Sequence, residues 1–346
     1  MGLFTARLHP EGFHGRTRAR PFFEGWYVKL VTKDLSQRWA VIPGVFLGTT
    51  GDGEAFVQVL DGATQRSWYH RVPLRDFQAE EGRFDVRVGG CRFSSAGIEL
   101  EGDLPLRGRL RFATPLQPWP VTLRSPGIMG WYAWMPFMEC YHGVVSFSHG
   151  LTGVLEIEGR EVRFDGGDGY IEKDWGQAFP SAYVWAQSNH FSTPGTCVLG
   201  SAAIIPWLRS SFRGFIAGVW HERRLYRFAT YTGAKLERLE LDDTHVRMTW
   251  TDRAHRLELV TERRRGGLLH APIRTEMHRR VEESMDGELY VRLTTRGGAV
   301  LLDDTGKAAS LEVHGDLDRL LTMKGWRSFP TRPVRLRRRE VSAGRR

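Results

Sequence analysis

Short runs of apolar residues, with polar residues alternating through several of them, recur along most of the chain between Gly, Asp and Pro turns. Such runs are typical of β-strands. Their spacing, about ten residues, favours antiparallel hairpins in a sandwich or barrel. The predicted strands are Trp26–Thr32, Trp39–Leu47, Phe56–Leu60, Phe84–Val88, Ile98–Gly102, Arg107–Phe112, Val144–Phe147, Val154–Glu158 and Glu161–Phe164. The sequence therefore predicts an all-β fold with few helices.

One segment, Ile273–Met285, has the spacing of a helix. Met277, Val281 and Met285 recur every four residues, just before an Asp-Gly pair. This spacing places apolar side chains on one face of a helix, and Asp-Gly is a common stop signal. We predict a helix here, with strand over part of the segment as the alternative.

The chain contains a coarse internal repeat. Trp26 and Phe56 are 30 residues apart, and so are Trp185 and Phe215. The implied period of about 159 residues is far longer than the repeats of solenoid proteins, so it indicates two similar domains. The predicted domains are residues 1–180 and residues 181–346. The second half shows no counterpart of the acidic strand described next, and we therefore expect one site.

The segment Tyr170–Gly176 carries polar side chains in an unusual pattern. In a strand, Tyr170, Glu172 and Asp174 share one face, which places two carboxylates about 7 Å apart beside a phenol. Lys173 points to the opposite face, where we expect it to face solvent or to pair with an acid.

A second strand signal follows closely and mixes aromatic with polar groups. Tyr183, Trp185, Gln187 and Asn189 share one face, and only small residues occupy the other. An ordinary half-buried strand keeps its polar groups away from its large apolar face. Here groups that can hydrogen-bond and aromatic rings point to the same place, which indicates a binding site.

The segment around Glu24 repeats this combination. As a strand it places Phe22, Glu24 and Trp26 on one face, so that a carboxylate lies among aromatic rings. Two interpretations follow: Glu24 belongs to a ligand site, or the segment closes the end of a small barrel with Glu24 hydrogen-bonded to a neighbouring part of the chain.

The segment Gly127–His142 contains two Trp, two Tyr and three Met. Methionine and aromatic side chains form adaptable apolar surfaces, which suit an isoprenoid tail or a membrane edge. The alternative is a long loop that covers the core.

Composition describes a globular protein with a basic charge. The 346 residues are 41% hydrophobic and 26% charged, with a net charge of +9. Arg327–Arg346 carries eight arginines against one acid, Glu340. Such a tail can contact anionic lipid, but no nucleic-acid-binding motif accompanies it, so we expect no nucleic-acid partner. Without an apolar leader or membrane-span pattern, we expect a cytoplasmic protein, with peripheral contact at the inner membrane face as a further option.

Several classes of enzyme lose support from the sequence. It contains no phosphate-binding loop, no H-E-x-x-H and no G-x-S-x-G motif. Its three cysteines, Cys91, Cys140 and Cys197, are far apart and odd in number, so we interpret them as reduced core residues. We expect no metal and no other cofactor.

Five segments together resemble motifs of the tocopherol cyclase family. They are Phe23–Tyr27, Met138–His142, Gly169–Gly176, Phe179-Pro180 and Trp185–Asn189. The similarity extends from about residue 10 to beyond residue 320. This family closes the chromanol ring of vitamin E from a prenylated hydroquinone, and it is distantly similar to carotenoid-hydratase-like proteins. The resemblance implies two lipocalin-like antiparallel β-barrels in tandem. In one departure, the plant and cyanobacterial motif has Asn at the position of Asp174.

The resemblance implies an isomerase, an intramolecular lyase, that protonates a prenyl alkene and lets the phenol oxygen attack the cation. Two carboxylates in a water-poor cavity resist simultaneous ionisation, so we assign the acid to Glu172 or Asp174, and a proton relay to Tyr170. Aromatic faces can stabilise the cation. The expected substrate-binding residues are Glu24, Trp26, His142, Trp175, Trp185, Gln187 and Asn189, of which Gln187 and Asn189 would hold the hydroquinone hydroxyls.

Two other interpretations stay open, and all three take an amphiphilic lipid as the partner. A lipocalin-like carrier would bind an isoprenoid quinone or another lipid without altering it. A hydratase would use the same acid to add water to an isoprenoid alkene. A pure carrier gains little from buried carboxylates, because unpaired buried acids cost several kcal/mol.

Overall fold

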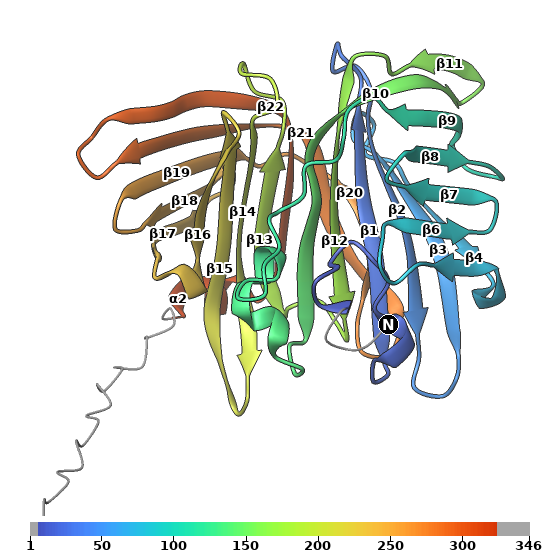
Figure 1. The fold of residues 1–346 in the computed structure, drawn as a ribbon, viewed down its shortest axis with the longest axis horizontal. Helices are drawn as coiled ribbons and strands as arrows, with labels where there is room; N and C mark the ends of the chain where they lie inside the picture. Colours follow the sequence, from blue (N-terminus) through green and yellow to red (C-terminus); the bar gives the residue numbers. More distant parts are fainter. Residues whose placement is uncertain (1–5, 324–346) are drawn as a thin grey trace, which may run out of the picture.

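The computed structural model describes residues 6–323 (Figure 1). The predicted arginine-rich tail lies outside the described residues. Two antiparallel sheets stand side by side, and each curls around its own apolar core into a nearly closed barrel. This architecture confirms the predicted all-β fold of two barrels in tandem.

The first sheet contains twelve strands within the described residues. Its strands are β1 (Phe22–Val31), β2 (Arg38–Leu47), β3 (Gly53–Asp61), β4 (Ser67–Val72), β5 (Phe77–Ala79), β6 (Asp85–Val88), β7 (Cys91–Ser94), β8 (Gly97–Leu100), β9 (Leu106–Phe112), β10 (Cys140–Ile157), β11 (Arg160–Arg163) and β12 (Gly167–Gly176). They lie in the order β4-β3-β2-β1-β12-β10-β9-β8-β7-β6-β5, and β11 pairs with β10.

The second sheet contains ten strands in the same part of the chain. Its strands are β13 (Ala182–Ser188), β14 (Cys197–Trp207), β15 (Ser210–His221), β16 (Arg224–Ala229), β17 (Lys235–Leu241), β18 (His245–Thr251), β19 (His255–Glu262), β20 (Gly267–Pro272), β21 (Met277–Thr295) and β22 (Val300–Gly315). They lie in the order β16-β15-β14-β13-β22-β21-β19-β18-β17, and β20 pairs with β21.

Helices between residues 6 and 323 are short. They are the 3₁₀ helices η1 (Gly15–Thr17), η2 (Leu74–Asp76), η3 (Gly127–Trp134) and η4 (Thr230–Thr232), and the α-helix α2 (Leu317–Thr322). Among the described helices, none has the length and apolar character needed to cross a membrane.

The two sheets share a topology that matches the sequence repeat. Trp26 and Trp185 lie in β1 and β13, which hold equivalent positions next to β12 and β22. Phe56 and Phe215 lie in β3 and β15, each two strands further along its sheet. The last strand of the first sheet ends at Gly176, and the second sheet begins at Ala182.

The central strands β1, β12 and β13 are buried on both faces. One face of each strand packs into its own barrel core, as Trp26, Ile171 and Val184 do. The other face meets the opposite sheet and forms a third apolar cluster with residues such as Tyr27 and Trp185. The polar side chains of these strands therefore lie inside the protein rather than in solvent.

Two sequence predictions need correction. The predicted helix Ile273–Met285 is wrong, because strand β21 begins at Met277. A four-residue spacing is also a multiple of two, so it places side chains on one face of a strand as well as of a helix. Val281 and Met285 accordingly share the cluster between the sheets. The separate strands predicted at Val144–Phe147 and Val154–Glu158 are parts of the single strand β10.

Candidate active site

A cavity of about 220 Å³ lies between the two sheets. Its wall combines β1, β2, β3, β10 and β12 of the first sheet with β13, β14, β15, β20, β21 and β22 of the second, and η3 also contributes. Most lining side chains are apolar or aromatic, and they include Phe23, Met129, Tyr132, Leu199, Phe212 and Met277. The cavity therefore suits a largely apolar ligand.

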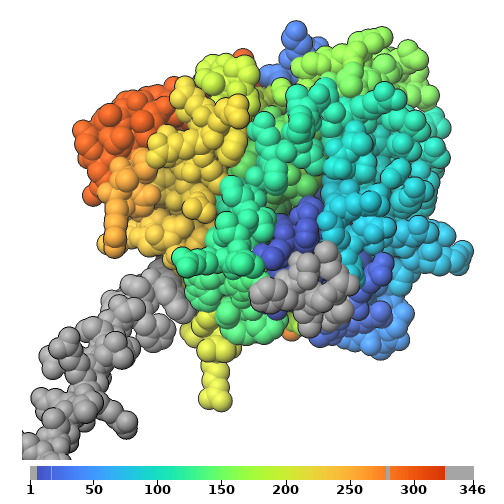
Figure 2. Space-filling model, viewed as in Figure 1, coloured from blue at the N-terminus to red at the C-terminus, as the bar shows by residue number. Residues whose placement is uncertain are grey.

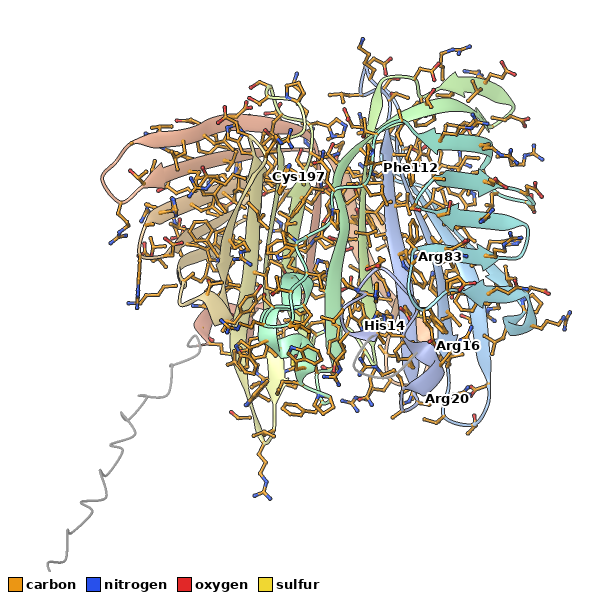
Figure 3. The ribbon with its side chains drawn as sticks, viewed as in Figure 1. His14, Arg16, Arg20, Arg83, Phe112 and Cys197 are labelled. Atoms are coloured by element: carbon orange, nitrogen blue, oxygen red, sulfur yellow. The ribbon has the colours of Figure 1, made fainter. Side chains whose placement is uncertain are left out.

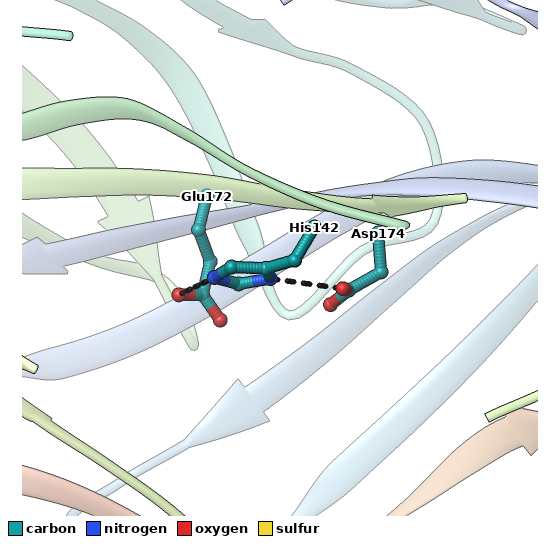
Figure 4. A group of neighbouring side chains, drawn as sticks. All are labelled: His142, Glu172 and Asp174. Atoms are coloured by element: carbon teal, nitrogen blue, oxygen red, sulfur yellow. Dashed lines mark hydrogen bonds and ion pairs between the residues drawn. The ribbon is translucent and has the colours of Figure 1, made fainter. Parts of the chain in front are cut away.

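Three titratable side chains meet on the wall of this cavity (Figure 4). The imidazole of His142 lies between two carboxylates, with Nδ1 2.9 Å from Asp174 Oδ1 and Nε2 3.4 Å from Glu172 Oε2. Antiparallel pairing of β10 with β12 sets His142 directly opposite Asp174. Glu172 and Asp174 share one face of β12, as the sequence predicts, because they are two residues apart.

The pKa values of this group follow from burial and charge. Burial raises the pKa of Glu172 to about 7. The charge of His142 lowers this pKa, and the charge of Asp174 raises it further. Burial lowers the pKa of His142, but the charges of Asp174 and Glu172 outweigh it and raise the value to about 9. At neutral pH, His142 is therefore cationic and Glu172 is protonated in a substantial fraction of molecules.

Tyr170 is buried next to Glu172 but does not itself line the cavity. Its hydroxyl donates a 2.5 Å hydrogen bond to Glu172 Oε2, and the ring is fully buried between the sheets. Tyr170 is therefore in place to orient Glu172, in agreement with its predicted position beside the acid.

The second sheet supplies another acid to the same cavity, Glu312 of β22. The hydroxyl of Tyr183 donates a 2.6 Å hydrogen bond to Glu312 Oε2. Burial raises the pKa of Glu312 to about 8. The hydrogen bond from Tyr183 lowers this pKa, and the charges of Glu172 and Asp174 raise it. Although the acidic motif occurs only in the first half, both halves thus contribute to one site.

A further buried acid, Glu283, lies opposite Glu312 in the pairing of β21 with β22. Tyr27 donates a short hydrogen bond from its hydroxyl to Glu283 Oε1, and Glu283 Oε2 is buried without a partner among the described residues. Burial and the charge of Glu312 raise the pKa of Glu283 to about 8. Buried Lys29 partly balances this negative charge.

Trp185 is the aromatic residue of the predicted set that lines the cavity. Its ring meets the ring of Tyr27 edge to face at 5.7 Å. The indole N–H is buried and has no acceptor in the described part of the chain. Because an unsatisfied buried donor costs about 1–3 kcal/mol, this N–H is a natural donor to an oxygen atom of a bound ligand.

Three of the predicted site residues lie on the other face of the sheet. Glu24 forms an ion pair with Lys173, whose Nζ lies 4.8 Å from the ring centre of Trp26 and 4.6 Å from that of Trp175. In the pairing of β1 with β12, Tyr27 lies opposite Glu172, and Glu24 lies opposite Trp175. Glu24 and Trp26 therefore face the core of the first barrel. This geometry corrects their expected position in the ligand site, and Lys173 is paired rather than exposed.

Gln187 and Asn189 lie between the sheets but do not line the cavity. Gln187 Oε1 accepts a 2.9 Å hydrogen bond from Lys29 Nζ, and Asn189 Nδ2 donates a 3.1 Å hydrogen bond to the carbonyl oxygen of Gly169. Their polar groups thus join the two sheets, which corrects the expectation that they hold hydroquinone hydroxyls.

The three cysteines differ in position. Cys91 and Cys197 are buried, in agreement with a core role, whereas Cys140 lines the cavity. Burial and the charge of Asp174 raise the pKa of the Cys140 thiol well above its ordinary value. Cys140 therefore presents a neutral thiol to the cavity rather than a reactive thiolate.

His142, Glu172 and Asp174 are also the described residues that could hold a metal ion, since one ligand atom from each lies within 4.8 Å of the others. In the observed arrangement, however, the two imidazole nitrogens point to different carboxylates. A single ion can use only one of these nitrogens, and that nitrogen would have to lose its proton. The geometry fits a protonated imidazole that bridges two acids.

Sequence signals existed for the two acids that the sequence prediction missed. Around Glu312, the polar residues Ser310, Glu312 and His314 alternate with Leu311 and Val313, which places them on one face of a strand. Glu283 lies inside the segment predicted as a helix. In the strand that forms there, Glu283 shares a face with Val281, which the helical period did not predict.

The fold and the site define an all-β protein of two tandem barrels with an acid-bearing, largely apolar cavity between them. The chain belongs to the tocopherol cyclase-like family, whose model matches residues 109–315. The rice protein "Probable tocopherol cyclase, chloroplastic" (Oryza sativa subsp. japonica) is 25% identical, over 89% of this chain and 78% of its own length. The maize protein "Tocopherol cyclase, chloroplastic" (Zea mays) is 24% identical, over 90% of this chain and 78% of its own length.

The fold also resembles solved structures. The crystal structure of a "putative AttH" from Nitrosomonas europaea has a TM-score of 0.54 with 12% sequence identity, and the match covers 88% of this chain and 94% of that one. At this identity the likeness shows a shared double-barrel fold.

Proposed function

We propose that this protein is an isomerase that closes a chromanol-type ring on a prenylated hydroquinone. One observation carries the proposal: a histidine bridges two carboxylates on the wall of a cavity that is otherwise mainly apolar and aromatic. Family membership supports the same reaction class. The cavity suits an isoprenoid tail, and the acidic group suits protonation of an alkene.

The reaction needs one proton donor and one acceptor. Glu172 in its acid form protonates the trisubstituted alkene, which forms a C–H bond and leaves a tertiary cation. The phenol oxygen then forms the C–O bond and loses its proton to the ionised Glu172 or, by way of His142, to Asp174. The proton gained equals the proton lost, so substrate and product have the same mass.

Positioning and exclusion of water supply the rest of the acceleration. Ring closure is intramolecular, so the cavity acts by holding the alkene and the phenol within reach of each other. The faces of Trp185 and Tyr27 can stabilise the cation without a covalent bond. Cys140 stays a neutral thiol, which limits capture of the cation by sulfur.

An unreactive carrier fits these features less well. Glu172 and Glu283 are buried in or beside the cavity, Glu312 on its wall is half-buried, and desolvation raises the pKa of each. Desolvated acids reduce stability, and a carrier of neutral lipids has no use for them. An enzyme that needs a carboxylic acid at neutral pH does have a use for such desolvated acids.

The proposal is tested by incubating the purified full-length protein with a set of prenylated hydroquinones and their quinones, with and without a metal chelator. We expect a product of unchanged mass and shifted retention from the hydroquinones, but not from the quinones, which lack the phenol. A gain of one water would indicate a hydratase, and recovery of bound but unaltered lipid would indicate a carrier. A requirement for added metal would overturn the proton-based mechanism.

The pH dependence of the reaction provides a second prediction. Glu172 must be protonated, so kcat/KM is expected to be high below its pKa of about 7 and to fall as the pH rises through that value. His142→Gln removes a cation that lowers the pKa of Glu172, so the falling limb should move to higher pH by about one unit.

A matched control is His149→Gln. Burial lowers the pKa of His149 to about 3, so this histidine carries no charge to remove at neutral pH. The pH profile of the control should keep the wild-type limb. An unmoved limb in His142→Gln would contradict the assignment of Glu172 as the group that titrates.

A further inference from the structure

Exposed apolar side chains gather at one end of the molecule. Seven large hydrophobic side chains are exposed among the described residues, and five of them lie in residues 121–137 and at the tip of the β14–β15 hairpin. Leu208 at this tip is 79% exposed, and Leu123 is 64% exposed. The hairpin projects beyond the body of the protein, with the segment that contains η3 beside it (Figure 2).

Aromatic contacts join these side chains into one surface. The ring of Trp207 lies 5.0 Å from that of Phe137 and 6.1 Å from that of Trp131, centre to centre. Leu208 follows Trp207 directly in the chain. We call the surface formed by Trp131, Phe137, Trp207 and Leu208 the docking patch.

The docking patch is continuous with the wall of the cavity. Tyr132 and Phe212 both line the cavity, and Trp207 contacts each of them, with ring centres 5.5 Å and 6.1 Å away. Trp131 stacks on Tyr132 at 4.1 Å. A lipid ligand that enters between these rings would move from the patch to the cavity along apolar side chains.

The charged residues of the two chain segments that form the docking patch are all basic. Residues 121–137 and 205–213 contain no acidic residue, and their charged residues are Arg124, Arg209 and Arg213. Arg124 and Arg209 are exposed. Protruding apolar and aromatic side chains flanked by arginine match the interface of an anionic bilayer, where aromatic rings lie at the headgroup level.

The described chain also ends close to this surface. Arg213 Nη1 donates a 3.1 Å hydrogen bond to the carbonyl oxygen of Leu321, and Arg319 Nη2 donates a 2.8 Å hydrogen bond to Ser211 Oγ. Helix α2 is thus held at the start of β15.

From these observations we propose that the docking patch binds the surface of a bilayer that contains anionic phospholipid, and that the amphiphilic ligand passes between bilayer and cavity there. A second copy of the chain fits the patch less well, because the arginines of two copies would face each other. Binding to the bilayer holds whether the ligand is cyclised or only carried, so its test is independent of the proposed reaction.

The test is flotation of the full-length protein with vesicles. We expect binding to vesicles of phosphatidylcholine and phosphatidylglycerol in equal parts, and weaker binding to phosphatidylcholine alone or at high salt. Leu208→Asp should reduce the partition coefficient by about tenfold, since it removes a large apolar contact and adds a repelled charge. Phe137→Asp should act in the same direction.

Val300→Asp is the matched control, since Val300 is 50% exposed and begins β22 in the second sheet, away from the docking patch. It introduces the same charge and should bind like the wild type. Equal binding of Leu208→Asp and wild type, or equal losses in Leu208→Asp and Val300→Asp, would overturn the proposal. So would a wild-type dimer in sedimentation that binds no vesicles and that Leu208→Asp converts to a monomer.

Discussion

Glu172→Gln is expected to lower the turnover of prenylated hydroquinone by about 10³-fold, because an amide cannot supply the proton that the alkene needs. Glutamine keeps the shape of the side chain and can still accept the hydrogen bond from Tyr170. The fold should therefore survive, and binding of substrate should change little. Single-turnover kinetics, together with a binding measurement, would separate the loss of chemistry from a loss of affinity.

Glu283→Gln is the matched control for this variant. Both glutamates are buried, both accept a hydrogen bond from a tyrosine, and burial raises both pKa values. Glu283 does not line the cavity, so its amide should retain most of the activity. Equal activity in Glu172→Gln and wild type, or equal losses in the two amide variants, would remove Glu172 from the role of acid.

Local sequence pattern was sufficient to predict the acidic face of β12. The period of a strand is two residues, so Glu172 and Asp174 had to share a face wherever the strand lay. The same rule separated Lys173 from them. It also predicted that Trp185 and Tyr183 point together, and both line the cavity.

The period alone could not predict which faces of neighbouring strands coincide. Glu24 and Glu172 both look like acids among aromatic rings, but they point in opposite directions because Trp26 pairs with Lys173. A shift of one residue in this register would have exchanged the two faces. Strands that are buried on both faces give no solvent-facing side from which the register could be inferred.

Contacts between the sheets were also beyond the sequence pattern. Glu172 and Glu312 are far apart in the chain, and their electrostatic coupling depends on how two separately formed barrels pack. The internal repeat predicted that two barrels exist. It contained no information on which faces meet, and therefore none on the acids that the second sheet adds to the cavity.

Lys173→Met is expected to destabilise the fold by about 3–5 kcal/mol, because it leaves the Glu24 carboxylate buried without its cation. Neither side chain of this ion pair is exposed. Lys173 Nζ also donates a 3.0 Å hydrogen bond to the carbonyl oxygen of Pro10, and it contacts His14, which Figure 3 labels beside the first sheet. Lys173 thus holds the N-terminal segment against the core, and thermal unfolding should begin roughly 10 °C earlier without it.

Removing both charges should restore part of this loss. In Glu24→Leu/Lys173→Met no carboxylate remains unpaired, so the double variant is expected to unfold at a higher temperature than Lys173→Met alone. Arg107→Met, which breaks the exposed ion pair with Glu156, serves as the control and should leave the unfolding temperature nearly unchanged. Wild-type stability in Lys173→Met would contradict a structural role for the buried pair.

The pH dependence of unfolding separates this pair from the acids of the cavity. Burial raises the pKa of Glu24, but the charge of Lys173 and the hydrogen bond with His14 outweigh it and hold the pKa below its ordinary value. Its stabilising contribution is therefore present above the pKa of an unfolded glutamate, about 4.3, and is lost as the pH falls through the lower folded value. Burial raises the pKa of Glu172, so that acid contributes the opposite slope, between about pH 4.3 and its folded value of about 7. Wild type should consequently lose stability on acidification below about pH 4, and Glu24→Leu/Lys173→Met should lose less.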